Sequence, residues 1–341
     1  MKKFFLTIIL ILINKNIYSN DIFDTSFYNI EFNSKNIEDD KLKEINKIKK
    51  ESFLFILNGT LDNKNFIKVN NYLTEDLINR FIQNIIINDE KIINDKYISK
   101  IKINFKKKKI INFFRQKNIP YVDYLPDKFL LIIYEKNKLD NNLLTKNNKH
   151  YKYYFTHLYE DNLFKIPNLD INDRFILTEE HIVSRDFEKI NKFTKKYNST
   201  DNLIIIVNYD KDKLVYDVIL NSDGHTLEKK LLYNKTEMSL FFEELENETL
   251  ELWKQINQIQ NKHLNLLSCK VNYFNMLELK EIRNNLLNVS LISNLKIKKL
   301  AYKNIEYEIY YYGNLKILFK LFELNKLKIN TNENSCIIRL I

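Results

Sequence analysis

Five histidines and two cysteines are the residues of this chain best suited to metal chemistry, but their spacing is not that of a metal site. No two histidines are four residues apart; the five are His150, His157, His181, His225 and His263. A His-Glu-x-x-His motif is absent, and Cys269 has no second cysteine at ligand spacing. We therefore expect no metal and no cofactor, and we interpret the histidines as surface or half-buried polar residues.

Phosphate-binding loops need glycines, because backbone amides must approach the ligand closely. This chain has three glycines, Gly59, Gly224 and Gly313, each in a different part of the sequence. We interpret each as a turn or cap residue. No serine has the glycine-flanked elbow of a hydrolase nucleophile. The sequence thus excludes a nucleotide site and offers no activated nucleophile.

Acidic clusters are the next candidates. Asp170 and Asp173 lie in a loop, where they could bind a cation or cap the following segment, and capping is the interpretation we favour. Adjacent acids at 179–180 and 243–244 are what 44 acidic residues produce by chance. We therefore predict no catalytic, cofactor-binding or metal-binding residue, and we expect the protein not to be an enzyme.

One aromatic cluster could face a glycan or a peptide. Its members are Tyr151, Tyr153, Tyr154, Phe155 and Tyr159. Packing in a core, or at an interface between units, explains such a cluster better, because large aromatic side chains are mostly buried in folded proteins.

Apolar periodicity predicts an N-terminal α/β unit over residues 21–135. Thr74 is a good N-cap for one of its helices, which we expect to continue through Ile85. The run 129–134 is wholly apolar, as in a strand buried on both faces. The expected elements are helices at 40–57, 74–85 and 107–117 and strands at 101–105 and 129–134.

A polar stretch up to residue 150 separates this unit from a second α/β unit with antiparallel strands, expected over 151–235. We expect Ser184 to cap a helix that ends near Tyr197. Gly224 closes a hairpin turn between the last two strands. The expected strands are 203–207, 214–220 and 226–233. A long helix over 236–262 is then predicted to connect two bodies.

Residues 263–341 have the order βαββαβ, which is the ferredoxin-like arrangement. The expected elements are strands at 269–274, 295–300, 305–312 and 327–329, with a continuation at 336–340, and helices at 277–287 and 314–324. The fold class is therefore α+β: several small α/β units and a C-terminal ferredoxin-like domain.

The two cysteines, Cys269 and Cys336, both fall in this last domain. The first and last strands of a ferredoxin-like sheet are antiparallel neighbours, but the last element here can also be a hairpin. A disulfide requires Cα atoms within about 7 Å. The sequence leaves the pairing open, and two independent buried thiols are the interpretation we favour.

The N-terminus has the pattern of a secretory signal peptide. Lys2 and Lys3 precede an uncharged apolar run at 4–13, and Ser19 is a small residue at a plausible cleavage point. The run is shorter than the roughly 20 residues of a spanning helix. We predict a signal peptide of about residues 1–19 and an exported, periplasmic protein; the pattern leaves open whether the segment is cleaved or retained.

The formal net charge of +10 would ordinarily suggest a nucleic-acid partner. The chain is crowded with Asn, Lys and Ile and contains a single alanine, Ala301. A+T-rich codons would impose that composition on any protein, so we expect no nucleic acid. Peripheral contact with an anionic envelope surface is the secondary partner that the charge favours.

Several segments, in this order, resemble the exported bacterial family catalogued as domain of unknown function 2066. They are 52–59, 101–120, 129–134, the Pro-x-x-Asp loop at 167–173, and the helix end and apolar strand at 196–204. The resemblance covers roughly residues 21–235. It implies an exported protein and carries over no functional residue.

We therefore expect a non-enzymatic periplasmic protein, a binding or accessory factor in cell-envelope assembly or transport. Its expected partner is another envelope protein, met through an exposed sheet edge. The alternative is an envelope hydrolase with a site assembled from dispersed acidic residues. The oligomeric state is left open by the sequence.

Overall fold

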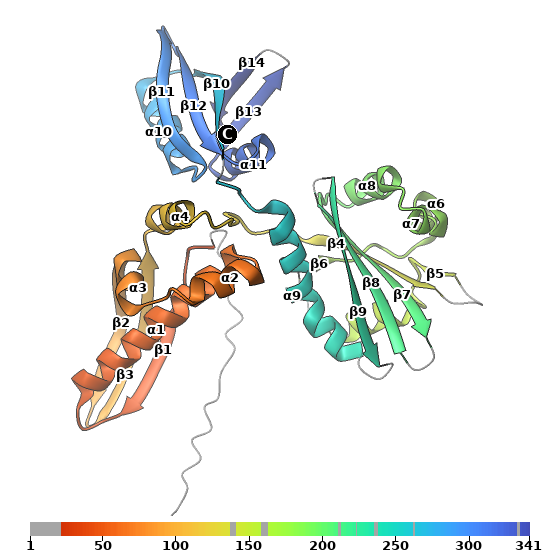
Figure 1. The fold of residues 1–341 in the computed structure, drawn as a ribbon, viewed down its shortest axis with the longest axis horizontal. Helices are drawn as coiled ribbons and strands as arrows, with labels where there is room; N and C mark the ends of the chain where they lie inside the picture. The colour runs from red at the N-terminus through yellow and green to blue at the C-terminus, as the bar shows by residue number, and fades with distance from the viewer. Residues whose placement is uncertain are drawn as a thin grey trace, which may run out of the picture. The chain divides into compact units, whose positions relative to one another are not determined.

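The computed structural model describes residues 22–136, 141–157, 163–210, 213–222, 224–234, 238–261, 263–332 and 335–341. The predicted signal segment lies outside these residues. The chain forms a smaller compact unit, comprising the residues up to Leu57 together with Leu73–Ile110, and a larger one, comprising Asn58–Tyr72 and Ile111–Ile341. Helices and strands are interspersed along the chain, and the strands form three separate sheets (Figure 1). This arrangement confirms the α+β fold class.

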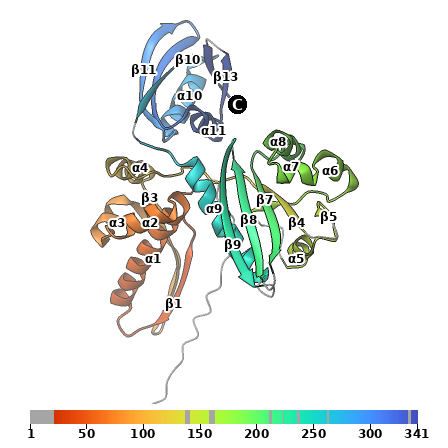
Figure 2. The same ribbon diagram turned by 45° about the vertical axis from the view of Figure 1, so that its right-hand side comes forward.

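The smaller unit is a three-stranded antiparallel sheet covered by helices. Its strands follow the order β1 (Tyr28–Asn33), β3 (Lys96–Phe105) and β2 (Ile82–Ile93), and its helices are α1 (Ile37–Thr60), which continues into the larger unit, and α3 (Glu75–Phe81). Alternate residues of β3 are buried, as its sequence predicted. Phe53 of α1 stacks on Phe81 and contacts Phe105, so α1 lies along the sheet (Figure 2).

The predicted helix from Thr74 to Ile85 is wrong at its end. Thr74 is the N-cap, since its side chain accepts a hydrogen bond from the Leu77 amide at 3.2 Å. The helix nevertheless stops at Phe81, and Ile85 pairs with Ile103 inside β2. Three consecutive isoleucines, 85–87, are β-branched and favour a strand. Pairing with β3 therefore outweighs the helical spacing.

The larger unit contains a six-stranded mixed sheet, β5-β4-β7-β8-β9, with the short β6 beside β4. β4 and β7 are parallel, and β7, β8 and β9 form an antiparallel meander. The strands are β4 (Phe129–Lys136), β5 (Asn141–Leu143), β6 (Phe164–Lys165), β7 (Asn202–Asp210), β8 (Lys213–Ser222) and β9 (His225–Asn234).

Helices cover both faces of this sheet. On one face the Tyr216 ring of β8 stacks on Phe241 at 3.7 Å; on the other, Asn221 donates to Asn191 of α8 at 2.6 Å. The first face carries α5 (Lys149–His157) and α9 (Met238–Asn257), and the second carries α6 (Ile171–Ile176), α7 (Glu179–Val183) and α8 (Phe187–Lys196). Figure 1 shows α9 and α8 on opposite sides of the strands. Two short helices, α2 (Asn63–Asn70) and α4 (Lys107–Gln116), precede the sheet in the chain.

Two expectations need correction here. β4 was placed at the end of the N-terminal unit, but it pairs with β7, with Ile132 opposite Ile204. The long helix predicted over 236–262 is α9, which packs on β8 and β9 and precedes the C-terminal sheet in the chain. Asp186, not Ser184, is the N-cap of α8. Local periodicity found these elements, but it carries no information on which sheet a strand joins.

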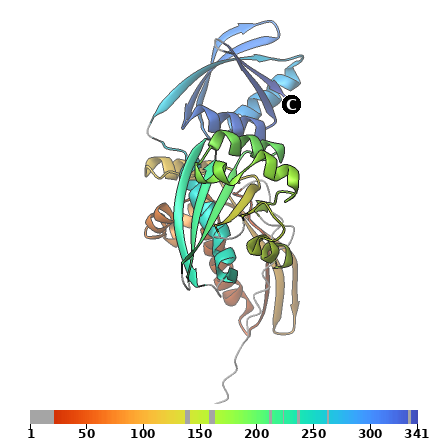
Figure 3. The same ribbon diagram turned by 90° about the vertical axis from the view of Figure 1, so that its right-hand side faces the viewer.

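The C-terminal sheet has the order β11-β12-β10-β14-β13, with α10 and α11 on one face (Figure 3). The predicted βαββαβ order is present. Its last element is a hairpin, which is one of the alternatives that the sequence left open, and β14 lies parallel to β10, between β10 and β13. The elements are β10 (Leu264–Asn272), α10 (Met276–Asn288), β11 (Ile292–Ala301), β12 (Asn304–Tyr312), α11 (Leu315–Leu324), β13 (Leu327–Asn332) and β14 (Ser335–Leu340).

Candidate functional site

Three polar side chains are buried where β4 meets α5: Glu135, His150 and Tyr216. Tyr209, which is 40% exposed, lies beside Glu135, and we call these four residues the polar cluster. Glu135 lies near the carboxyl end of β4, and Tyr209 near that of the parallel neighbour β7. In open α/β sheets this edge is where ligands commonly bind. The cluster is therefore the first place to look for chemistry.

Direct hydrogen bonds connect its members. His150 Nδ1 lies 2.6 Å from Glu135 Oε1, and the His150 backbone amide donates to the same oxygen at 3.2 Å. His150 Nε2 lies 2.9 Å from the Tyr216 hydroxyl. With Nδ1–H donating to the carboxylate, Nε2 can accept the tyrosine proton, so one tautomer satisfies both ring nitrogens.

The start of α5 fixes the position of His150. The Asn148 side-chain oxygen accepts hydrogen bonds from the amides of His150 and Tyr151, at 2.9 and 3.1 Å. Its amide nitrogen donates to the carbonyl of Ile133 in β4 at 3.3 Å. A single asparagine thus begins the helix and attaches it to the strand that carries Glu135.

Burial and hydrogen bonding act in opposite directions on Glu135. Desolvation favours the neutral acid, but the hydrogen bonds from the His150 ring and from backbone amides outweigh it and hold the pKa of Glu135 below its usual value. At Tyr209, burial, together with the charge and hydrogen bond of Glu135, raises the hydroxyl pKa to about 12. The carboxylate is therefore the charged centre of the cluster.

A carboxylate, an imidazole and a hydroxyl in this order resemble a proton relay, but the relay is sealed. His150 and Tyr216 are 0% exposed, and Phe241 stacks over the Tyr216 ring. No substrate atom can reach either group in this conformation. The arrangement can hold α5 against β4 and β8, which is a structural role.

Sequence reasoning missed this cluster. His150 was interpreted as a surface or half-buried residue, and that interpretation is wrong. The one available signal was a glutamate at the end of a wholly apolar strand, because a carboxylate buried there needs a partner. Nothing in local spacing identifies His150 as that partner.

Asp170 and Asp173 do come together, and the predicted cap is present. Asp170 Oδ1 accepts from the Asp173 amide at 2.9 Å. Asp173 itself is fully buried and accepts from Lys196 Nζ and the Tyr197 hydroxyl, both at 2.6 Å. Its oxygens are engaged by the protein, and no group of three metal-ligating residues occurs among the described residues.

The other histidines are not brought to one place. His181 Nδ1 accepts from the Thr178 amide in a capping box, and His157 stacks on Tyr153 at 4.2 Å. The aromatic cluster divides: Tyr151 and Tyr154 are buried as expected, whereas Phe155 is exposed. Tyr159 lies outside the described residues. Glu179 accepts a hydrogen bond from the Tyr134 hydroxyl, and Glu244 accepts one from the Tyr233 hydroxyl. These two acids therefore hold neighbouring elements together.

A cavity of about 60 Å³ lies in the larger unit. Two acids that line it, Asp127 and Asp201, are the kind of dispersed pair that the hydrolase alternative needs. Asp127 is paired with Lys320 at 3.0 Å. Ligand pockets are usually about 300 Å³ or more. A cavity of this volume accommodates a few waters.

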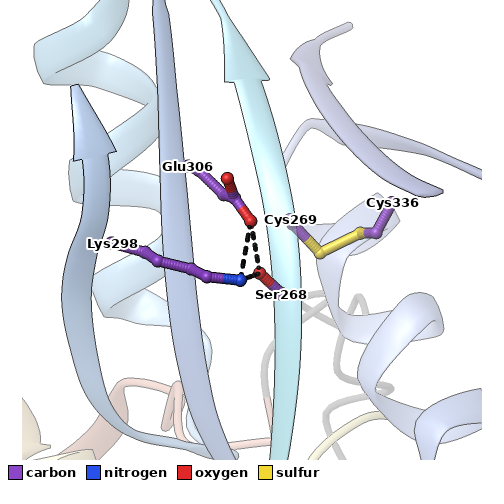
Figure 4. The surroundings of a disulfide bond; sticks show 5 residues. All are labelled: Ser268, Cys269, Lys298, Glu306 and Cys336. Carbon is purple, nitrogen blue, oxygen red and sulfur yellow. Dashed lines mark hydrogen bonds and ion pairs between the residues drawn. A yellow bond between two sulfur atoms is a disulfide. The ribbon is translucent and has the colours of Figure 1, made fainter. Parts of the chain in front are cut away.

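The two cysteines form a disulfide, so the favoured interpretation of two separate thiols is wrong. Cys269 and Cys336 are joined with a Cα–Cα distance of 4.5 Å (Figure 4). β14 returns beside β10, with Ile337 opposite Lys270, and this parallel register brings the two cysteines together. Both lie on the helix-covered side of the sheet. Ser268, next to Cys269, faces the other side and binds Glu306.

Comparison of the chain with protein-family models, curated proteins and solved structures finds no significant match. The resemblance to the exported family described above therefore stays a prediction. Within the part of the chain that the structure describes, no helix has both the length and the apolar character needed to cross a bilayer.

Proposed function

We propose that the protein is an exported, periplasmic binding or accessory factor in envelope assembly or transport. It acts by pairing an extended segment of another envelope protein with the free edge of β9. The observation that supports this proposal is the regularity of β9, a ten-residue edge strand whose pairing with β8 runs without a register shift from His225 to Asn234. Such an edge is a template for strand addition.

The other sheet edges are less suitable. β2 and β11 each have two register shifts. Bulges are one of the devices by which proteins prevent edge pairing. Lysines are another, but they do not separate these strands, because β9 carries Lys229 and Lys230 and β11 carries lysines at 296, 298 and 299. β1, β5 and β13 have six residues or fewer. β9 is thus the long edge that lacks a register shift.

Side-chain contacts hold β9 from both faces. Glu228 pairs with Arg185, which follows α7, while Lys229 pairs with Glu248 and the Tyr233 hydroxyl donates to Glu244, both on α9. These pairs fix the strand before a partner arrives. A preorganised strand loses little conformational entropy on binding, which favours association.

Proline substitution tests the edge. Ser222 and His225 are the pair that closes the β8–β9 hairpin, and backbone bonding alternates along an antiparallel ladder. Counting from that pair, the Lys230 amide points away from β8. Lys230→Pro removes an outward donor and leaves the β8 ladder intact, because proline is tolerated on edge strands. Lys230→Ala is the matched control, since it removes the same charge and keeps the amide.

The readout is cross-linked capture from envelope extract. We expect the wild type and Lys230→Ala to recover the same partner, and Lys230→Pro to recover at least tenfold less. Adding that partner should slow hydrogen exchange of the β9 amides. Equal capture by both variants, or no partner above background with the wild type, would contradict the proposal.

Export is tested separately. Mass spectrometry of the native protein should find a chain that begins near Asn20. If the native chain retains the segment 4–13, the protein is tethered to the membrane and is not a released factor.

A further inference from the structure

The C-terminal sheet ends in a group of very exposed apolar side chains, which we call the apolar tip. Its members are Phe274, Met276, Leu277, Leu300 and Tyr302, which are 83%, 69%, 80%, 68% and 89% exposed. Single exposed apolar residues are ordinary, but a group of large ones at one place marks an interaction surface.

The fold brings these residues together from two separate segments. Asn272 at the end of β10 pairs with Asn304 at the start of β12. The pairing continues past the strands, because the Tyr273 amide donates to the Lys303 carbonyl at 3.2 Å. The β10–α10 loop therefore lies beside the β11–β12 turn, which places Phe274 and Tyr302 at the same end of the sheet.

The loop is held in place by its own hydrogen bonds. Asn275 is the N-cap of α10 and accepts from the Glu278 amide at 2.9 Å. Glu278 Oε2 accepts in return from the Phe274 amide at 2.6 Å. This reciprocal capping fixes the backbone that displays Phe274, Met276 and Leu277. Their exposure is thus built into a defined turn.

Basic residues are in excess in the two chain segments that carry the tip. The two segments that form it, 270–283 and 296–306, contain seven basic residues and three acidic ones. The basic residues are Lys270, Lys280, Arg283, Lys296, Lys298, Lys299 and Lys303, and the acids are Glu278, Glu281 and Glu306. Glu278 accepts from the loop amide, and Glu306 pairs with Lys298 at 3.0 Å, so that pair takes up one base and one acid (Figure 4). Six basic and two acidic residues remain. The segments that carry the tip are therefore positively charged.

We infer that the apolar tip docks on an anionic lipid surface. Phe, Met, Leu and Tyr side chains projecting from two adjacent turns form a protrusion, which suits insertion between headgroups better than the binding of a peptide. Aromatic side chains favour the membrane interface, and lysines around them are attracted to anionic headgroups while their alkyl stems stay in contact with apolar surface. This surface does not include β9, so the inference stands apart from the function proposed above.

Vesicle sedimentation of the chain from Asn20 onward, which lacks the apolar run 4–13, tests the inference. With vesicles containing 30% phosphatidylglycerol in phosphatidylcholine, we expect binding at least tenfold stronger than to phosphatidylcholine alone. The double change Phe274→Ser and Leu277→Ser should reduce that binding tenfold or more. Phe175→Ser is the matched control, because Phe175 is 78% exposed on α6, away from the tip.

A second pair of variants tests the charge. Lys299→Gln with Lys303→Gln should weaken binding to anionic vesicles, whereas Lys192→Gln with Lys195→Gln, on exposed positions of α8, should not. Vesicles should also slow hydrogen exchange over residues 273–277. All substituted side chains are exposed, so the variants keep the fold. Equal sedimentation of the tip variants and their controls, or binding of the tip to another protein but not to vesicles, would overturn the inference.

Discussion

His150 and Glu135 are fifteen residues apart in sequence and 2.6 Å apart in the fold, joining the first turn of α5 to the end of β4. Both side chains are almost completely buried. Burying an unpaired carboxylate would cost several kcal/mol, so the contact is what permits a glutamate at that position. The stability of the larger unit should therefore depend on this pair.

We predict that Glu135→Gln lowers the free energy of unfolding by about 2 kcal/mol, because hydrogen bonds to a charged group are stronger than those to a neutral amide. Urea denaturation at pH 7 measures the change. Glu228→Gln is the control, since Glu228 makes an exposed ion pair with Arg185 and should change stability by less than about 1 kcal/mol. If the two substitutions lower the free energy of unfolding equally, the buried pair stabilises the fold no more than the exposed one does.

The same pair predicts a pH dependence. The pKa of Glu135 is lowered in the folded protein, so its contribution is present above the unfolded value of about 4.3 and is lost as the pH falls through the folded value. The stability difference between the wild type and Glu135→Gln should be constant from pH 7 to 5 and shrink below about pH 4. Urea titrations at several pH values measure it; a difference that is unchanged at pH 3 would contradict the assignment.

Elements made by local spacing were predicted well. The helix around Ile45 and Phe53, the alternating strand through Ile101 and Ile103, and the hairpin turn at Gly224 all occur where expected. The errors arose where pairing between distant residues decides the outcome. Ile85 fits the helical spacing of the preceding residues, but the β-branched run 85–87 and pairing with β3 select the strand.

The sites were less predictable than the elements. Asp170 was expected to cap the next segment because a cap depends on neighbours along the chain, and it does. The His150–Glu135 contact and the cysteine pair depend instead on how distant segments align. The two partners are 15 residues apart in the first case and 67 residues apart in the second. The apolar tip also needs two segments, and neither Phe274 nor Tyr302 alone is unusual. These sites therefore depend on contacts between distant segments, which local periodicity does not report.

The disulfide gives a third prediction. A bridge across 67 residues restricts the unfolded chain, and on the chain-entropy account its removal costs about 4 kcal/mol. Cys269→Ser with Cys336→Ser should lose that amount in urea denaturation. The wild type with dithiothreitol should shift by the same amount, and the double variant should not respond to the reductant. If dithiothreitol does not change the free energy of unfolding of the wild type, the disulfide does not stabilise the fold.

The loop that contains Asp170 and Asp173 allows a matched pair of substitutions, because the two aspartates lie three positions apart and have different partners. Asp173 is buried and accepts from Lys196 and the Tyr197 hydroxyl, so Asp173→Asn leaves an ammonium without its countercharge. We expect a loss of about 3 kcal/mol in the free energy of unfolding. Asp170→Asn should change little, because asparagine caps a helix as well as aspartate does. Thermal and urea unfolding of both variants measure the difference. If Asp173→Asn is as harmless as Asp170→Asn, the buried carboxylate does not anchor the loop to the end of α8.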